Sequence, residues 1–385
     1  MIPYGRQTIG DDDIKAVIDV LTSDFLTQGP AVPAFENAVA TVCGAAHAVA
    51  VNSATSALHI ACMALGVGAG DIVWTSPITF VASSNCALYC GARVDFVDID
   101  PATQNISVQC LTEKLQAAER AGTLPKVVIP VHFAGHPCDM KPIHALGQKY
   151  GFKIIEDASH AIGARYQQTL IGDCAYSDIT VFSFHPVKII TTAEGGMATT
   201  QSAKLARSMQ LLRSHGVTRD AAELEEPNEG PWYYEQHLLG YNYRMTDLQG
   251  AVGVVQIQRL DEFINERAQW ADYYRRELAG LDWLKTPEFS TDYQHGWQSF
   301  VTLIDEAKSP MKRNDLMEYL QQKGVSTRPG THAVHMLSYY QRTMGTRPDD
   351  FPGARDSDQL SMSIPLHNRM IAEDYAYVVA ALKSA

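Results

Sequence analysis

The chain has 385 residues, of which 46% are apolar and 19% are charged, and its net charge is −12 at pH 7. This length predicts roughly two domains, and the composition excludes a disordered chain because it can bury a sizeable core. The acidic balance and the lack of a basic run argue against nucleic acids and acidic membranes as partners.

We expect no signal peptide, because the N-terminus has neither a basic region nor an apolar stretch. No window approaches the roughly 18 uninterrupted apolar residues of a membrane span. The seven cysteines are scattered and lie mostly inside apolar segments. Their odd number and irregular spacing fit neither a disulfide framework nor a zinc site, so we expect free thiols and a cytoplasmic location.

At the N-terminus, apolar residues recur at helical spacing from Ile14 to Leu21, and three aspartates precede them. This pattern predicts a short helix whose positive N-terminal end is stabilised by the aspartates. Turn residues at 26–30 end this segment, and a second helix is expected over residues 31–42.

Between residues 46 and 200, short and almost continuously apolar runs alternate with helical segments. Such a pattern is typical of a mostly parallel sheet that helices cover on both faces. The predicted strands are 48–51, 72–75, 93–97, 127–132, 153–157, 179–184 and 195–199, and the predicted helices are 56–66, 79–90, 110–121 and 139–150.

Beyond residue 200 the sequence predicts a helix, a polar and aromatic loop at 225–236, and a long helical stretch over 246–278. We place the domain boundary in this stretch, near residue 260. The result is a large α/β domain over 1–260, with a helical segment at 1–30, and a small α+β domain over 261–385. In the small domain, strands are expected at 297–304 and 325–328, and helices at 311–323 and 371–383.

Two segments could bind an anion and a cation. Residues 52–58 (NSATSAL) stand between a strand and a buried helix, where free N–H groups and hydroxyls can bind phosphate. The alternative is an ordinary helix cap by Ser53 or Thr55.

Asp157 ends an apolar strand, at the sheet edge where open α/β sheets bind ligands. A buried carboxylate there needs a cation such as a protonated pyridine nitrogen, unless it only caps the next helix.

Three further positions could react with a ligand or contact it. Lys188 follows an apolar strand, where a desolvated lysine is a nucleophilic amine; the alternative is a solvated loop lysine. The ring of Phe80 could stack on a flat cofactor or lie in the core. Residues 240–245 could contact a ligand or a second subunit. Taken together, these groups fit pyridoxal phosphate, which needs an anion site, a carboxylate for its ring nitrogen and a lysine for a Schiff base.

Two other patterns predict no ligand site. The glycines of 66–70 follow a helix and precede a strand, which is the reverse of the order in a dinucleotide fingerprint. His332 and His335 have no acidic residues close by in the sequence, so we predict no metal.

The chain resembles the nucleotide-sugar aminotransferases of the DegT/StrS type, which are fold-type I pyridoxal-phosphate enzymes, over essentially its whole length. The resemblance implies a mostly parallel seven-stranded sheet flanked by helices, a smaller C-terminal α+β domain, and a homodimer with shared active sites. The segments that carry the resemblance are 52–58, 156–160, 182–188, 194–196 and 240–244.

The resemblance also implies roles for single residues. Lys188 would form the Schiff base, Asp157 would hold the ring nitrogen and His160 would flank the ring. The cofactor would also be bound by Ala54, Thr55, Ser56 and Ser183 around its phosphate, by Phe80 stacked on its ring, and by Asn242 of the neighbouring subunit. The substrate-binding positions would be Tyr4, Leu26, Thr27, Gln28, Gly29, His185, Arg244, Arg328 and Thr331.

Residues 3–7, 26–29 and 185–188 are most similar to the branch of the family that aminates C4 of a UDP-linked 4-keto-6-deoxy-N-acetylhexosamine for pseudaminic acid, with L-glutamate as the expected donor. Residues 325–335 are more similar to perosamine-type relatives that act on other nucleotides. A GDP-perosamine-type enzyme, or another aminotransferase for nucleotide-linked 4-keto-6-deoxyhexoses, is therefore an alternative. A non-catalytic regulatory protein that binds pyridoxal phosphate is another. Related sugar dehydratases have histidine in place of Lys188.

Overall fold

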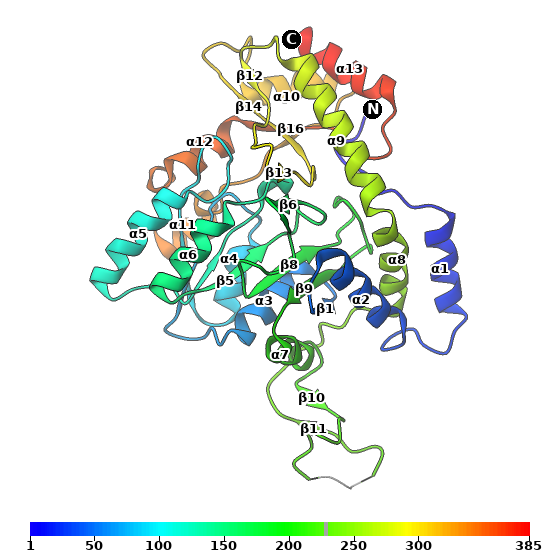
Figure 1. Ribbon diagram of the computed structural model, residues 1–385. Helices are drawn as coiled ribbons and strands as arrows, with labels where there is room; N and C mark the ends of the chain where they lie inside the picture. The colour runs from blue at the N-terminus through cyan, green and yellow to red at the C-terminus, as the bar shows by residue number, and fades with distance from the viewer. Residues whose placement is uncertain (227–229) are drawn as a thin grey trace.

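A seven-stranded sheet forms the centre of the computed structural model, which describes residues 1–226 and 230–385 (Figure 1). Strand β9 runs antiparallel to both its neighbours, and the other adjacent pairs are parallel, so the predicted mostly parallel sheet is confirmed. The strands in spatial order are β1 (His47–Val51), β9 (Gly196–Thr200), β8 (Ile179–Ser183), β5 (Lys153–Asp157), β4 (Val127–Ile129), β2 (Ile72–Thr75) and β3 (Arg93–Phe96).

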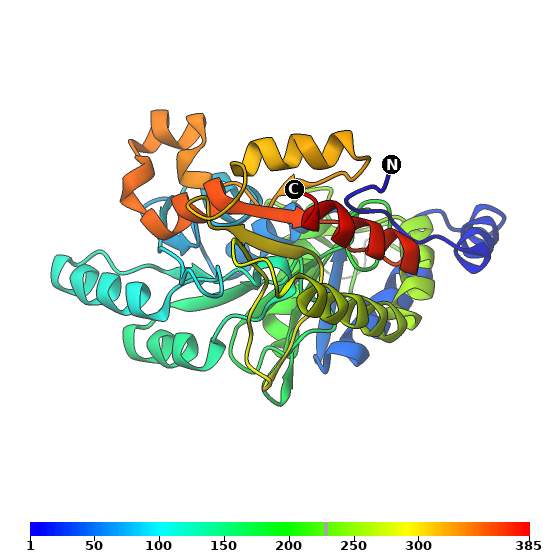
Figure 2. The same ribbon diagram turned by 90° about the horizontal axis from the view of Figure 1, so that it is seen from above.

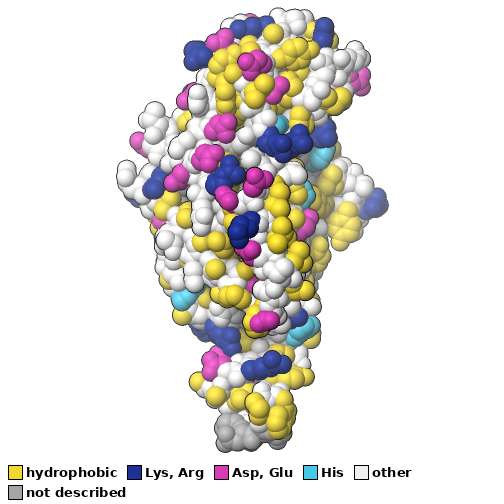
Figure 3. Space-filling model, turned by 90° about the vertical axis from the view of Figure 1, so that its right-hand side faces the viewer, with side chains coloured by type: hydrophobic (Ala, Val, Ile, Leu, Met, Phe, Trp, Pro, Cys, Tyr) yellow, Lys and Arg dark blue, Asp and Glu magenta, His cyan; other side chains and the backbone are white. Residues whose placement is uncertain are grey.

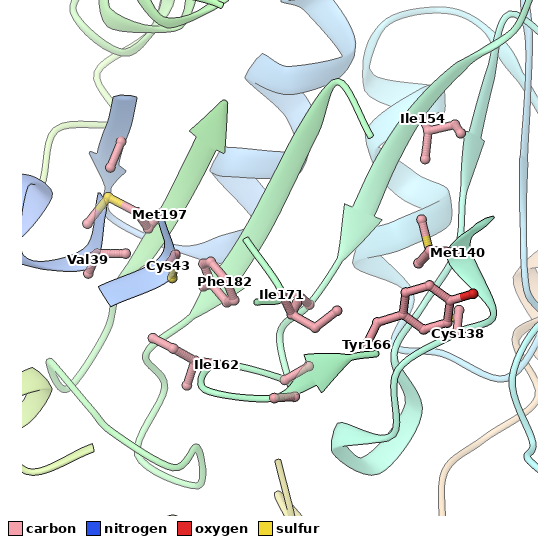
Figure 4. Close-up of a cluster of buried hydrophobic side chains, with 14 of the residues drawn as sticks. Val39, Cys43, Cys138, Met140, Ile154, Ile162, Tyr166, Ile171, Phe182 and Met197 are labelled. Carbon is pink, nitrogen blue, oxygen red and sulfur yellow. The ribbon is translucent and has the colours of Figure 1, made fainter. Parts of the chain in front are cut away.

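Helices cover both faces of this sheet, as the apolar strands require. Because side chains alternate along a strand, Ile154 and Phe182 belong to one core cluster, while Ile155 and Val181 belong to the other. Figure 4 shows part of the first cluster, with Phe182 and Ile154 among its members. The helices α2 (Ala31–Cys43), α5 (Val108–Ala121) and α6 (Met140–Tyr150) contribute to the first cluster, and α3 (Ala54–Ala64), α4 (Ala82–Tyr89) and α7 (Ala203–Arg213) contribute to the second.

The C-terminal part has its own sheet and its own apolar core. The predicted long helix is two helices, which meet at Arg259, so the predicted boundary near residue 260 falls at their junction. Figure 2 shows the C-terminal sheet with helices α10 and α13. The elements are α8 (Asp247–Gln258), α9 (Leu260–Leu278), β12 (Leu284–Lys285), β14 (Phe300–Ile304), α10 (Arg313–Gln322), β15 (Arg328–Pro329), α11 (Ser338–Met344), α12 (Pro352–Leu360), β16 (Ser361–Ile364) and α13 (Ala372–Lys383).

Two small sheets were not predicted. One is three-stranded, with β6 (Arg165–Tyr166), β7 (Thr169–Leu170) and β13 (Tyr293–Gln294). The other is a ribbon of β10 (Val217–Thr218) and β11 (Glu235–Gln236), which projects from the body of the molecule (Figure 1). The predicted loop at 225–236 lies in this projection, and its residues 227–229 are outside the described residues.

The predicted N-terminal helix is α1 (Asp11–Leu21), but its apolar face does not pack on this chain. Ile14, Ile18 and Leu21 are 52%, 53% and 56% exposed. The opposite side of α1 packs on α8, where Asp13 is buried and its Oδ1 accepts a hydrogen bond of 2.9 Å from Gln256. Figure 3 shows hydrophobic side chains gathered on the face of the molecule that carries α1.

In the described part of the chain, no helix has both the length and the apolar character that crossing a membrane requires. Across the same residues, no group of three or more histidine, cysteine, aspartate and glutamate side chains is arranged to hold a metal ion.

Candidate active site

A cavity of about 530 Å³ lies where the predicted reactive residues meet. Asp157 and Ser183, the last residues of β5 and β8, line this cavity together with Ala54 and Thr55 at the start of α3. This is the edge at which open α/β sheets bind ligands. A larger hollow of about 690 Å³ lies between α12 and β14, and its described lining contains none of the predicted site residues.

The start of α3 can accept a phosphate group. Ser53 caps this helix, since its hydroxyl accepts a hydrogen bond of 3.2 Å from the N–H of Ser56. The N–H groups of Ala54 and Thr55 are in the first turn, where they have no partner within the helix, and both residues line the cavity. At Gly196 a Cβ atom would come within 2.4 Å of the Ser53 backbone, so glycine lets β9 lie directly against this turn.

Asp157 is held by two serines. Its Oδ2 accepts a hydrogen bond of 2.6 Å from Ser83, and its Oδ1 accepts bonds of 2.6 and 3.1 Å from the hydroxyl and N–H of Ser159. The residues that follow form turns, so Asp157 does not cap a helix. Asp157 is 5% exposed and borders the cavity, where its carboxylate can bind a cationic ring nitrogen.

Lys188 and His160 border the same cavity and share a low-dielectric environment. Burial lowers the pKa of Lys188 to about 8, although the charge of Asp157 opposes this shift. Burial, and then the charge of Lys188, hold the pKa of His160 well below its ordinary value. Nδ1 of His160 is buried and has no hydrogen-bond partner among the described residues. A neutral histidine with a free ring nitrogen fits a position beside a polar cofactor ring.

Phe80 is an exposed aromatic residue at this cavity. Its side chain is 73% exposed, so it is not part of the core and its ring is free to stack on a flat group. The anion site, the carboxylate, the lysine and the aromatic ring therefore surround one cavity, and this set of residues fits pyridoxal phosphate.

The structure brings most of the predicted cofactor residues together. The predicted site residues that line the cavity are Tyr4, Ala54, Thr55, Phe80, Asp157, His160, Ser183, His185, Lys188 and Thr331. Ser56 is buried, and its hydroxyl donates a bond of 2.6 Å to Asn52, so it supports the turn instead of lining the cavity.

Other predicted positions lie away from the described lining of this cavity. The turn at 26–29 is held at the start of α8, where the N–H of Gly29 donates a bond of 2.7 Å to Asp247. Arg328 borders a separate shallow hollow beside α10. The remaining predicted residues outside the described lining are Leu26, Thr27, Gln28, Arg244 and the exposed Asn242. The roles of all these residues stay predictions.

Several cavity residues were missed by the sequence analysis. Ser159 lies in the segment 156–160 and Glu194 in the segment 194–196. Both segments carry the family resemblance, which was the signal that could have identified these two residues. Gln298 and Ser299 come from the C-terminal part and had no local signal. The amide of Gln298 donates a bond of 2.5 Å to the carbonyl of Val187, next to Lys188, and the hydroxyls of Ser299 and Tyr4 are 2.7 Å apart.

Comparison with known proteins agrees with this geometry. A family model described as the DegT/DnrJ/EryC1/StrS aminotransferase family matches residues 7–383. The chain is 38% identical over 383 residues to the spore coat polysaccharide biosynthesis protein SpsC of Bacillus subtilis, which covers 99% of this chain and 96% of that protein.

Solved structures match the whole chain. PseC of Helicobacter pylori, an aminotransferase involved in the biosynthesis of pseudoaminic acid, is 26% identical with a TM-score of 0.90, over 100% of this chain and 98% of that one. The pyridoxal-phosphate form of Spr1654 from Streptococcus pneumoniae is 26% identical with a TM-score of 0.88, over the same shares of the two chains. The chain described here therefore belongs to the DegT/DnrJ/EryC1/StrS aminotransferase family, and it is a pyridoxal-phosphate-dependent sugar aminotransferase.

Proposed function

We propose that this enzyme transfers an amino group from L-glutamate to C4 of a UDP-linked 4-keto-6-deoxy-N-acetylhexosamine, in the biosynthesis of pseudaminic acid. The observation that carries the proposal is the match to PseC over the whole chain, together with a single cavity that contains Lys188 and Asp157. The similarity of residues 3–7 and 185–188 to that branch of the family supports the same substrate.

The chain's own residues have the properties that this reaction needs. Pyridoxal phosphate, when bound, supplies an electron sink for negative charge on the reacting carbon. Asp157 would hold its ring nitrogen, and the start of α3 with Ser183 would hold its phosphate. Lys188 would move the proton at the reacting carbon. Because the pKa of this lysine is about 8, both its protonated and its neutral forms are populated near neutral pH.

A second substrate class has support of its own. SpsC, with 38% identity, is a spore coat polysaccharide biosynthesis protein, and residues 325–335 resemble perosamine-type relatives. The second candidate is therefore the amination of a GDP- or dTDP-linked 4-keto-6-deoxyhexose. It shares the reaction of the first candidate and differs in the nucleotide and in the sugar substituent at C2.

Product analysis with a panel of substrates tests the proposal. The holoenzyme would be incubated with L-glutamate and with UDP-, GDP- or dTDP-linked 4-keto-6-deoxy sugars, and the products analysed by mass spectrometry. We expect an amino sugar from the UDP-linked N-acetylhexosamine at the highest kcat/KM. A higher kcat/KM for a GDP- or dTDP-linked sugar contradicts the proposed substrate, and no amino sugar from any member contradicts both candidate substrates.

We also propose that the enzyme is a homodimer with shared active sites. The exposed apolar face of α1 supports this, because an apolar helix face of this kind is normally covered. Asn242 is exposed and lies outside the cavity of its own chain, where it is free to reach a second subunit. Sedimentation of the holoenzyme measures the mass, and a species of only 42.3 kDa would contradict the proposal. The cytoplasmic location stays a prediction.

A further inference from the structure

Two buried hydroxyl groups connect to the carboxylate of Asp157. Ser83, in α4, donates a hydrogen bond of 2.6 Å to Oδ2 of Asp157, and the hydroxyl of Thr79 lies 2.6 Å from that of Ser83. Ser83 is fully buried and Thr79 is 4% exposed. Removing the Ser83 hydroxyl therefore takes a donor from Oδ2 of Asp157, and removing the Thr79 hydroxyl takes a partner from that of Ser83.

The chemistry of the groups gives this chain of bonds a direction. An ionised carboxylate accepts hydrogen bonds and cannot donate them, so the single hydroxyl hydrogen of Ser83 points to Asp157. The oxygen of Ser83 then accepts the hydrogen of Thr79. The carbonyl of Phe80, at 3.4 Å from the Ser83 hydroxyl, is a more distant acceptor than the carboxylate at 2.6 Å. The shorter, charge-assisted bond is the stronger one.

Asp157 keeps one acceptor position for a ligand. An ionised carboxylate has about four acceptor positions. The hydroxyl and N–H of Ser159 occupy Oδ1, and Ser83 occupies one side of Oδ2. The position that remains belongs to Oδ2, and Asp157 borders the cavity.

We propose that Thr79 and Ser83 are positioning residues, which direct Oδ2 of Asp157 toward the ring nitrogen of pyridoxal phosphate. The proposal rests on the proposed role of Asp157. A carboxylate that is directed at the ring nitrogen accepts a hydrogen bond from its protonated form and so favours that form. Ser83 is outside the described lining of the cavity, so it acts through Asp157. Thr79 borders the cavity, and its hydroxyl contacts Asp157 only through that of Ser83.

The variant Ser83→Ala tests this role, and Ser84→Ala is its matched control. Ser84 is the next residue of α4 and is also fully buried, but its hydroxyl lies 2.7 Å from that of Tyr340 and not beside Asp157. The readouts are the dissociation constant of pyridoxal phosphate and the pH midpoint of the visible absorbance of the lysine-bound cofactor. Both are measured without substrate.

We expect Ser83→Ala to raise the dissociation constant about tenfold relative to Ser84→Ala, because Oδ2 of Asp157 is no longer directed at the ring nitrogen and that charged hydrogen bond is weakened. We also expect the pH midpoint to rise. When the ring nitrogen is less fully protonated, the ring withdraws less electron density from the nitrogen that joins Lys188 to the cofactor. That nitrogen is then more basic, so it loses its proton at a higher pH.

Two variants at Thr79 separate the hydroxyl from packing. Thr79→Val removes the hydroxyl at almost constant volume, while Thr79→Ser keeps it. The midpoint should rise in Thr79→Val, by less than in Ser83→Ala, and should stay at the wild-type value in Thr79→Ser. This pair also keeps the proposal testable if Ser83→Ala does not fold.

Equal midpoints in Ser83→Ala and Ser84→Ala, or in the two Thr79 variants, overturn the proposal. Asp157→Asn shows which assumption has failed. A large shift in Asp157→Asn with no shift in Ser83→Ala means that only the role of the hydroxyls is wrong. Wild-type binding and titration in Asp157→Asn mean that the role of Asp157 itself is wrong, and the proposal falls with it.

Discussion

Replacing Lys188 by alanine is expected to abolish the visible absorbance of the lysine-bound cofactor and to lower the rate of transamination by about 10³-fold, because the variant loses both the amine that binds the cofactor and the group that moves the proton. Absorbance spectra and single-turnover amination of the keto sugar measure the two losses. Lys204→Ala is the control, since Lys204 is an exposed lysine of α7.

The same amine makes cofactor capture depend on pH. The neutral form of Lys188 is the nucleophile, and its pKa is about 8, so the rate at which the apoenzyme captures pyridoxal phosphate should rise with pH and level off above about 8. A primary amine such as methylamine should partly restore turnover to Lys188→Ala. Turnover of Lys188→Ala at the rate of Lys204→Ala would refute the assignment.

The second large effect concerns stability, at the buried pair of Glu156 and His132 on the strand that carries Asp157. Nε2 of His132 lies 2.8 Å from Oε2 of Glu156, while Ser177 and Thr180 donate bonds of 2.5 and 3.0 Å to Oε1. Burial raises the pKa of Glu156, but the bonds from His132, Ser177 and Thr180 outweigh this and hold the pKa below its ordinary value of 4.5.

His132→Ala is expected to lower the free energy of unfolding by about 3 kcal/mol near pH 7, because it leaves a buried carboxylate without its main partner. Urea unfolding measures this loss. The control is His144→Ala, since His144 is a half-buried histidine of α6 whose Nδ1 lies 3.1 Å from the carbonyl of Tyr176. We expect that variant to lose about 1 kcal/mol or less.

The sign of the pH dependence follows from the lowered pKa of Glu156. A carboxylate with a lower pKa in the folded state stabilises the fold above its unfolded pKa, and this stabilisation is lost as the pH falls through the folded value. The difference between wild type and His132→Ala should therefore be largest near neutral pH and shrink below about pH 4. A difference that grows toward acid pH would contradict this account.

The central sheet could be predicted from the sequence because its strands are buried on both faces. Mostly apolar runs such as 48–51 and 179–184 have few other stable arrangements, and their observed ends agree within one residue. The small sheets were missed because strands of two residues, such as β10 and β11, show no periodicity. The break at Arg259 was also missed, since α8 and α9 continue one helical pattern.

The sequence by itself determined which residues are the candidates for the chemistry, and three of them line one cavity. Lys188, Asp157 and Thr55 each follow or end a predicted strand, and parallel strands bring their carboxyl ends to one edge of the sheet. Only the tertiary structure decided what surrounds them. Gln298 and Ser299 reach the cavity from more than 100 residues away, and the two hydroxyls beside Asp157 become visible only as contacts. Local periodicity encodes the elements, whereas contacts between distant elements depend on how those elements pack.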